Sequence, residues 1–319
     1  MTIKINGSGS TNGNPEKNSS WERNMLEKLL LEVYREQRRN RIWRWVWRLL
    51  WLCIIIFIIT AAMGSSIPNS PHTAVIDLSG VISSENNQAE LLRKSLKTAY
   101  KNKNVKGIII RANSPGGSPV ISSIAYEEIR HLKAKHPKIP LYVVTEDMCA
   151  SGCYYIASAA DKIYADPSSL VGSIGVIGSS FDFTGLIDKL GIKRRVKIAG
   201  NNKDMGDPFV PETPEQAEIW QQMLSSIHKQ FIQAVQQGRG DRLKVADNPD
   251  IFSGRAYTGE EAKAVGLVDD FGNIYTVARD VIEAPELVDY TAETSWKRFG
   301  RSIGSTLQQN FQGMADKPW

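Results

Sequence analysis

Three short segments of this sequence carry residues that could do chemistry. The first, Asn113-Ser-Pro-Gly-Gly117, follows an apolar run. A Pro-Gly-Gly turn allows positive φ angles and lets backbone N–H groups point toward a ligand. Such amides suit an oxyanion hole, where they stabilise the negative charge of a tetrahedral intermediate. Taken by itself, the segment also fits an ordinary strand-to-helix turn.

The second segment is Met148-Cys-Ala-Ser-Gly-Cys-Tyr-Tyr155, which also follows an apolar run. Its pattern places Ser151 at the start of a short helix, with an exposed hydroxyl and the Gly152 amide beside it. A serine at this position is also a common helix N-cap. Cys149 or Cys153 is a poorer candidate for the nucleophile, because no histidine lies near in sequence to activate a thiol.

The third segment is Gly200-Asn-Asn-Lys-Asp-Met-Gly-Asp-Pro-Phe209. Most lysines are solvated surface residues, but a lysine that burial keeps neutral can act as a general base. Lys203 is the candidate for this role. Ser226-Ile-His-Lys229 also fits the S-x-x-K pattern of penicillin-recognising enzymes, yet it lies in a glutamine-rich amphipathic stretch without a K-T-G partner. We interpret that match as coincidence.

The elements that must position these segments alternate between short apolar runs and amphipathic helices. This pattern predicts an α/β fold with a mostly parallel sheet. The predicted strands cover residues 74–78, 106–111, 140–145, 162–165 and 174–177. The predicted helices cover residues 88–101, 121–135, 151–160, 215–237 and 258–265, with a further possible helix at 296–311 in a polar C-terminal extension, 284–319.

The sequence of the N-terminal part predicts a membrane anchor. Residues 1–20 are rich in Gly, Asn and Ser and are expected to be disordered, and residues 21–37 have a helical pattern within a cytosolic segment, 1–41. Residues 42–63 are expected to span the membrane once, followed by a linker at 64–73. Six arginines between residues 35 and 48 fall just before the apolar run, and no Lys or Arg follows until Arg93, which places the N-terminus in the cytosol and the remainder outside. A cleavable signal peptide is disfavoured because its n-region would be far too long.

Charge, cysteine and histidine usage exclude several other classes. The net charge is +5, but no basic stripe with interleaved aromatics recurs, so nucleic-acid binding is not expected. Three cysteines form no disulfide framework, and Cys149 and Cys153 are too few ligands for zinc. The four histidines fall in linker or surface-helix contexts, which gives little support to a Ser-His-Asp triad. No metal or cofactor is implied.

Taken together, the strings IRANSPGGS, MCASGCYYIASAADKIYADPSSLVGSIGVI and KLGIKRRVKIAGNNKDMGDPF resemble the signal peptide peptidase SppA (protease IV) family. The similarity runs from about Ala74 to Phe271 within a peptidase domain at 74–283, and FSGRAYTGEEAKAVGLVDDFG closes it. The resemblance implies a fold of stacked βαβ units like those of ClpP and the crotonases. Its site assignments are a nucleophile at Ser151, a general base at Lys203, oxyanion-hole amides at Gly117 and Gly152, and a supporting serine at Ser173 expected to hydrogen-bond the lysine.

The family usually shows two glycines after the serine, whereas this chain has Gly152 and then Cys153. We expect Cys153 to add a side chain to the pocket wall and to affect substrate preference there.

The resemblance implies a serine endopeptidase in the inner membrane that degrades remnant signal peptides and other extended hydrophobic peptides outside the cytoplasm. Double-length relatives draw the serine and the lysine from different halves, so a single-length chain is expected to form a homo-oligomeric ring with a shared dyad. Alternatives are a SohB-like or stomatin-operon-type serine protease with another substrate, or a non-catalytic crotonase-like binding scaffold.

Overall fold

The computed structural model describes residues 25, 27, 28, 31, 38, 41–56 and 69–292 of the chain. The chain divides into two units, residues 1–66 and 67–319. In the first unit, residues 41–56 are helical and their side chains are exposed, tryptophans included. Across the described residues, no helix combines the length and the apolar character needed to cross a membrane. Residues 57–63 of the predicted anchor, the predicted disorder at 1–20 and the possible helix at 296–311 lie outside the described residues.

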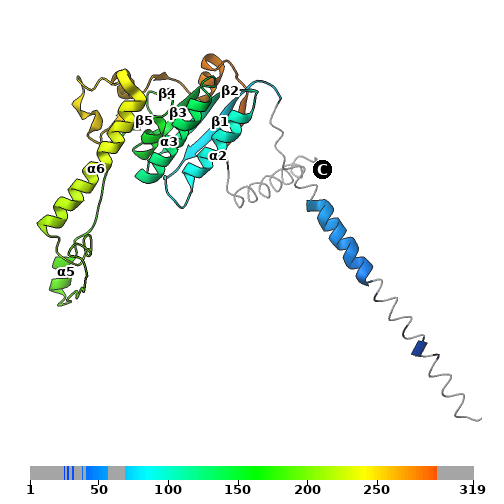
Figure 1. The fold of residues 1–319 in the computed structure, drawn as a ribbon, viewed down its shortest axis with the longest axis horizontal. Helices are drawn as coiled ribbons and strands as arrows, with labels where there is room; N and C mark the ends of the chain where they lie inside the picture. Colours follow the sequence, from blue (N-terminus) through cyan, green and yellow to red (C-terminus); the bar gives the residue numbers. More distant parts are fainter. Residues whose placement is uncertain are drawn as a thin grey trace, which may run out of the picture. The chain divides into compact units, whose positions relative to one another are not determined.

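A mixed eight-stranded sheet forms the second unit (Figure 1). Its main path runs β6-β5-β3-β2-β1-β8, and β4 pairs with both β3 and β7. Every neighbouring pair is parallel except β5 with β6, which confirms the predicted mostly parallel sheet. The strand bounds are β1 His72–Ser79, β2 Val105–Ser114, β3 Leu141–Ala150, β4 Lys162–Ala165, β5 Leu170–Gly172, β6 Ala256–Thr258, β7 Asp270–Phe271 and β8 Leu287–Asp289.

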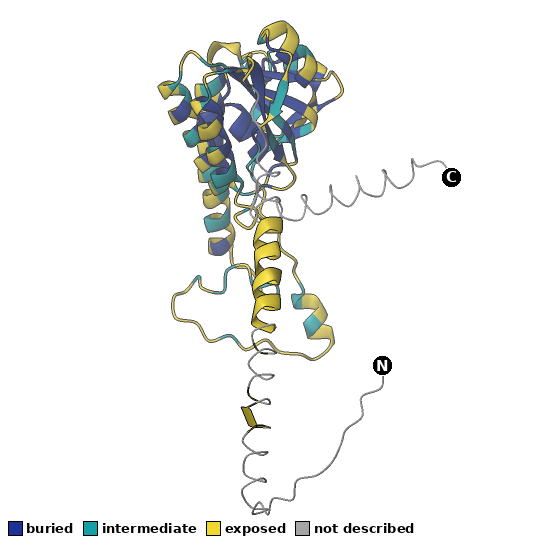
Figure 2. Ribbon diagram, turned by 90° about the vertical axis from the view of Figure 1, so that its right-hand side faces the viewer, coloured by how far each residue is buried: buried dark blue, intermediate teal, exposed yellow. Residues whose placement is uncertain are grey.

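Helices with one buried face cover the sheet, as Figure 2 shows by the dark inner and yellow outer sides of their ribbons. Ser118 caps α3 by accepting a hydrogen bond from the Ile121 N–H, and Thr213 begins α6 in a reciprocal capping box with Gln216. The α-helix bounds are α2 Gln88–Lys101, α3 Pro119–Lys135, α4 Gly152–Ala157, α5 Thr184–Lys189, α6 Pro214–Arg239, α7 Gly259–Ala264 and α8 Ile274–Thr276. Short helical turns lie at Gly240–Arg242, Pro249–Phe252 and Val277–Val281.

The predicted strand at 174–177 is wrong. The strand in this region is β5, which ends at Gly172, and positive φ angles at Gly172 and Ser173 turn the chain out of the sheet. The remaining predicted strands and the predicted helices within the described residues are present. Their bounds shift by a few residues, most at the C-terminal ends of β2 and β3.

A buried ion pair ties the end of α6 to the segment before β7. Arg239 is 2% exposed, and its Nη1 lies 2.6 Å from Oδ2 of Asp269. The same carboxylate oxygen accepts a hydrogen bond of 2.7 Å from the Ile163 N–H. Burial opposes the charge of Asp269, but the hydrogen bond and charge of Arg239 outweigh it and hold the pKa of Asp269 below its ordinary value. Both charged groups of this buried pair therefore have hydrogen-bond partners, since Arg239 also donates to the Gly266 carbonyl at 3.1 Å.

Candidate active site

Ser151 occupies the sharp turn between β3 and α4. Its φ is 53° and its ψ is −123°, a conformation that non-glycine residues rarely adopt and that is typical of functional sites. The backbone holds the turn at both ends, because the Ser151 N–H donates to the Gly172 carbonyl at 2.8 Å and the Ser151 carbonyl accepts from the Tyr155 N–H at 3.0 Å. The hydroxyl makes no helix-capping hydrogen bond. The N-cap alternative for this serine is therefore wrong, and its oxygen is left for other chemistry.

The Pro-Gly-Gly turn lies directly against the Ser151 turn. Gly116 and Gly117 have φ angles of +97° and +148°. A Cβ atom on Gly116 would lie 2.6 Å from the Gly152 nitrogen, and one on Gly117 would lie 2.1 Å from the Ile82 carbonyl oxygen. Neither position can hold a side chain without moving backbone, so the close approach of the two turns requires both glycines.

Two backbone donors at this junction have no acceptor among the described residues. Neither the Gly117 N–H nor the Gly152 N–H donates a hydrogen bond there. The two sites are close, since a Cβ atom on Gly152 would lie 3.2 Å from the Gly117 nitrogen. Free amides next to a nucleophilic oxygen are what an oxyanion hole requires.

A cavity of about 110 Å³ opens beside Ser151. Its walls are mostly apolar, and the Tyr155 and Phe231 rings stack with centroids 4.9 Å apart. The lining residues are Gly117, Pro119, Ser151, Gly152, Tyr155, Gly175, Val176, Ile177, Ile227 and Phe231. Sequence reasoning missed the contribution of α6, because Ile227 and Phe231 have the same spacing as an ordinary core-facing stripe.

Lys203 does not line this cavity. It is exposed and lies in a different hollow, formed by residues 194–209. The loop that holds it is tied to the start of α6, where Gln216 donates to Asp204 at 3.0 Å. The cavity residue Ile227 follows on the same helix, about 16 Å further along its axis. Among the described residues, Ser151 and Lys203 therefore line separate hollows, and no hydrogen bond joins their side chains.

Ser173 is held near Ser151 by a backbone hydrogen bond of the residue before it. It follows Gly172, whose carbonyl accepts from Ser151, and the Ser173 N–H donates to the Arg255 carbonyl at 2.9 Å. Its φ is +50°. Ser173 does not line the cavity, and the described part of the chain shows no hydrogen bond between its side chain and Lys203. Its supporting role stays a prediction.

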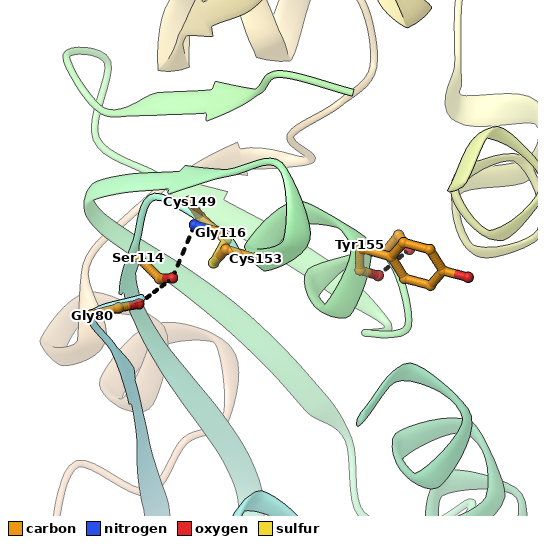
Figure 3. Close-up of a disulfide and its surroundings, with 7 residues drawn as sticks. Gly80, Ser114, Gly116, Cys149, Cys153 and Tyr155 are labelled. Carbon is orange, nitrogen blue, oxygen red and sulfur yellow. Dashed lines mark hydrogen bonds between the residues drawn. A yellow bond between two sulfur atoms is a disulfide. The ribbon is translucent and has the colours of Figure 1, made fainter. Parts of the chain in front are cut away.

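The cysteines differ from the sequence expectation in two ways. Cys149 and Cys153 form a disulfide, whereas the sequence predicted no disulfide framework (Figure 3). Cys153 is 0% exposed and faces the core rather than the cavity. The prediction that it adds a side chain to the pocket wall is therefore wrong. The turn at Ser151 accounts for the disulfide, because it brings the two Cα atoms to 5.1 Å.

The other chemical candidates lie apart from the cavity or have structural partners. His228 bonds to the Ile174 carbonyl at 3.0 Å, and His72 bonds to the Tyr290 hydroxyl at 2.9 Å. No histidine lines the cavity, and Ser226 lies in the middle of α6. Over the residues that the structure describes, no group of His, Cys, Asp and Glu is arranged to hold a metal ion.

Several known proteins with similar sequences are named as proteases. Residues 133–287 match peptidase family S49. A putative protease of Methanocaldococcus jannaschii, MJ0651, is 34% identical over 246 residues, which cover 74% of this chain and 78% of that protein. A putative signal peptide peptidase SppA of Enterococcus faecium is 33% identical over 196 residues, or 61% of this chain and 56% of that protein.

One of the similar proteins is named as an antiporter and not as a protease. The Na(+)/H(+) antiporter NhaA of Brucella melitensis is 46% identical over 184 residues, which are 58% of this chain but only 25% of the antiporter. The chain therefore matches a quarter of that protein. Together with the extensive match to the archaeal protease, these similarities show that the chain belongs to peptidase family S49, the serine-type peptidases that include SppA and protease 4.

Proposed function

We propose that the chain is a membrane-anchored endopeptidase that cleaves extended hydrophobic peptides, notably remnant signal peptides, with a Ser151–Lys203 dyad. The observation that carries this proposal is Ser151 itself, a strained residue whose hydroxyl and two neighbouring amides have no hydrogen-bond partner among the residues that the structure describes. Ser151 Oγ attacks the scissile carbonyl carbon, and the uncharged Lys203 amine takes its proton. The Gly117 and Gly152 amides hold the oxyanion, and Lys203 then protonates the leaving amine.

The dyad requires a lysine from a second copy of the chain. Within one chain the Lys203 loop lies at the N-terminal end of α6, whereas the cavity lies against its middle. Figure 1 shows α5 beyond the sheet, at the far end of α6. The segment around α5, residues 181–192, exposes large apolar side chains, among them Phe181 at 75%, Leu190 at 64% and Ile192 at 55%. Exposed apolar surface of this extent supports an interface, and repetition of the same head-to-tail contact would close a homo-oligomeric ring.

The cavity supports an apolar substrate side chain. Its volume of about 110 Å³ is well below that of sites that enclose a whole small molecule. Apolar walls next to the nucleophile favour an aliphatic residue beside the cleaved bond, as in the apolar core of a signal peptide. This size and polarity support a peptidase that holds one side chain at a time.

The N-terminal segment supports attachment to the inner membrane, with the catalytic unit outside the cytoplasm. The helical residues 41–56 expose tryptophans and carry Arg44 and Arg48 near their start. Tryptophan and arginine are typical of the interface between a membrane and the cytosol. We propose that residues 42–63 together form the anchor.

Mixing two inactive variants tests the shared dyad. Ser151→Ala and Lys203→Met chains are each expected to be inactive on an internally quenched hydrophobic peptide. In co-expressed mixtures, random assembly leaves about a quarter of interfaces with an intact serine facing an intact lysine, so activity returns. Ser226→Ala is the matched control and keeps full activity. Inactivity in mixed oligomers of verified composition would exclude a shared dyad, and activity of Ser151→Ala alone would exclude the nucleophile.

A further inference from the structure

The Cys149–Cys153 disulfide brackets Ser151. It joins the residue two positions before the serine, on β3, to the residue two positions after it, on α4. Both cysteines are 0% exposed. The disulfide therefore closes a small covalent ring around the nucleophile turn from its core side.

The ring also contacts the other half of the candidate site. In the sheet Cys149 pairs with Ser114, the last residue of β2. The Ser114 hydroxyl donates to the Gly80 carbonyl at 2.6 Å and accepts from the Gly116 N–H at 3.1 Å. Figure 3 shows Ser114 and Gly116 beside the two sulfurs. The disulfide thus lies where the strand before Ser151 meets the Pro-Gly-Gly turn.

Ser151 needs such a restraint because of its backbone conformation. An L-residue at φ 53° and ψ −123° is strained, and the structure around it must prevent its relaxation. Relaxation would rotate the peptide between Ser151 and Gly152, which carries the Gly152 N–H. It would also turn the hydroxyl away from the cavity. Two backbone hydrogen bonds hold the turn, and the disulfide is the covalent restraint across it.

We propose that the Cys149–Cys153 disulfide is a positioning device for Ser151 and the Gly152 amide, so that peptidase activity depends on oxidation of this pair. The inference rests on the proposed function, since it concerns the same nucleophile. Reduction by a dithiol transfers two electrons to the pair: one reductant thiolate attacks a cysteine sulfur and releases the other cysteine as a thiolate, and the second reductant thiolate then attacks the reductant sulfur of the mixed disulfide and releases the remaining cysteine. The reductant leaves as a cyclic disulfide, and the protein gains two thiols. The reduced turn keeps its residues but loses its covalent restraint.

The experiment uses the full chain in detergent with an internally quenched hydrophobic peptide and a fluorophosphonate probe that reports the reactivity of Ser151. Peptide mapping without reductant first tests whether Cys149 and Cys153 are joined in the purified protein. Cys149→Ala/Cys153→Ala removes the disulfide, and Cys53→Ser is the matched control because it removes the other cysteine. Leu96→Ala, a core change on α2, shows how activity responds to lost stability alone. Thermal unfolding is followed for every variant, and activity is measured well below each midpoint.

For the double variant we expect kcat and the labelling rate to fall about tenfold or more, with KM within about twofold of wild type. Cys53→Ser and Leu96→Ala keep kcat close to the wild-type value. The Cys53→Ser variant is also reduced by a dithiol until denaturation and alkylation show two free thiols. This reduction should lower kcat and the labelling rate as in the double variant, and reoxidation should restore both.

Three results would overturn the inference: no disulfide in the oxidised active protein, full kcat and labelling in the double variant, or a loss that Leu96→Ala reproduces. Failure of the proposed function is a separate result, because Cys53→Ser and wild type would then show no hydrolysis that depends on Ser151.

Discussion

Gly152→Ala tests whether the contact between the two turns forms the oxyanion hole. The added Cβ atom would lie 2.5 Å from Oγ of Ser122 and 3.2 Å from the Gly117 nitrogen. Ser122 cannot easily yield, because it is 0% exposed and its hydroxyl donates to the Ser118 carbonyl at 2.9 Å. The strain therefore pushes the Gly117 turn away from Ser151, although φ at Gly152 itself suits any residue.

The expected loss is that of one oxyanion donor. Removal of such a donor lowers kcat by about 10²–10³-fold, which corresponds to about 2.7–4 kcal/mol of transition-state stabilisation. KM should change little, because the donor acts on charge that develops only in the transition state. Ser122→Ala in the same chain removes the 2.5 Å clash and leaves only the 3.2 Å contact. The double variant should therefore regain part of the lost kcat.

Steady-state kinetics on the quenched peptide measure these effects, with thermal unfolding as the check on folding. Gly185→Ala is the matched control, since a Cβ atom there meets nothing within 4 Å, and it should leave both kcat and KM unchanged. A Gly152→Ala variant with wild-type kcat would refute the assignment of this junction as the oxyanion hole. A loss that appears only in KM would do the same.

Three other predictions concern the base, the core and the membrane topology. Lys203→Arg should be as inactive as Lys203→Met on the same peptide, because a guanidinium stays charged and cannot accept a proton. Asp269→Asn should lower the free energy of unfolding at pH 7 by about 3–5 kcal/mol, because it leaves the Arg239 charge buried and unpaired. Since the folded pKa of Asp269 is depressed, this difference should shrink as pH falls below the unfolded value of about 3.9, and denaturant titrations at pH 7 and pH 3 compare the two. Alkaline phosphatase fused after residue 100 should be active and the same reporter fused near residue 30 inactive; the reverse pattern would overturn the topology.

The sheet and the nucleophile turn were predictable because their signals are local. The apolar runs of β1, β2 and β3 alternate with amphipathic helices, and parallel strands bring their carboxyl ends to one edge. That edge is where Ser151 and the Pro-Gly-Gly turn meet. Each segment taken by itself also fitted an ordinary turn or helix cap, so the prediction that the two belong to one site came from the resemblance of the combined motifs to a known family.

The disulfide and the cavity wall depended on geometry that no local pattern encodes. The pairing of Cys149 with Cys153 arises from the positive φ at Ser151, and a spacing of four residues does not specify that angle. Ile227 and Phe231 enter the cavity from a helix distant in sequence, with the same periodicity as residues that only fill a core. Short strands such as β5 and β7 were missed or misplaced because two or three residues show no period.

The separation of Ser151 from Lys203 has a functional consequence under the proposed mechanism. Ser151 is fixed by the sheet, the Pro-Gly-Gly turn and a disulfide, whereas Lys203 lies in an exposed loop tied to the first turn of α6. A serine hydroxyl without a base is a weak nucleophile, so a single chain has a preformed oxyanion site but little reactivity. Activity would then require both oxidation of the cysteine pair and assembly with a second copy. If the catalytic unit lies outside the cytoplasm, as proposed, both conditions would be met there, because disulfides persist in oxidising compartments and attachment to a membrane raises the local concentration of copies.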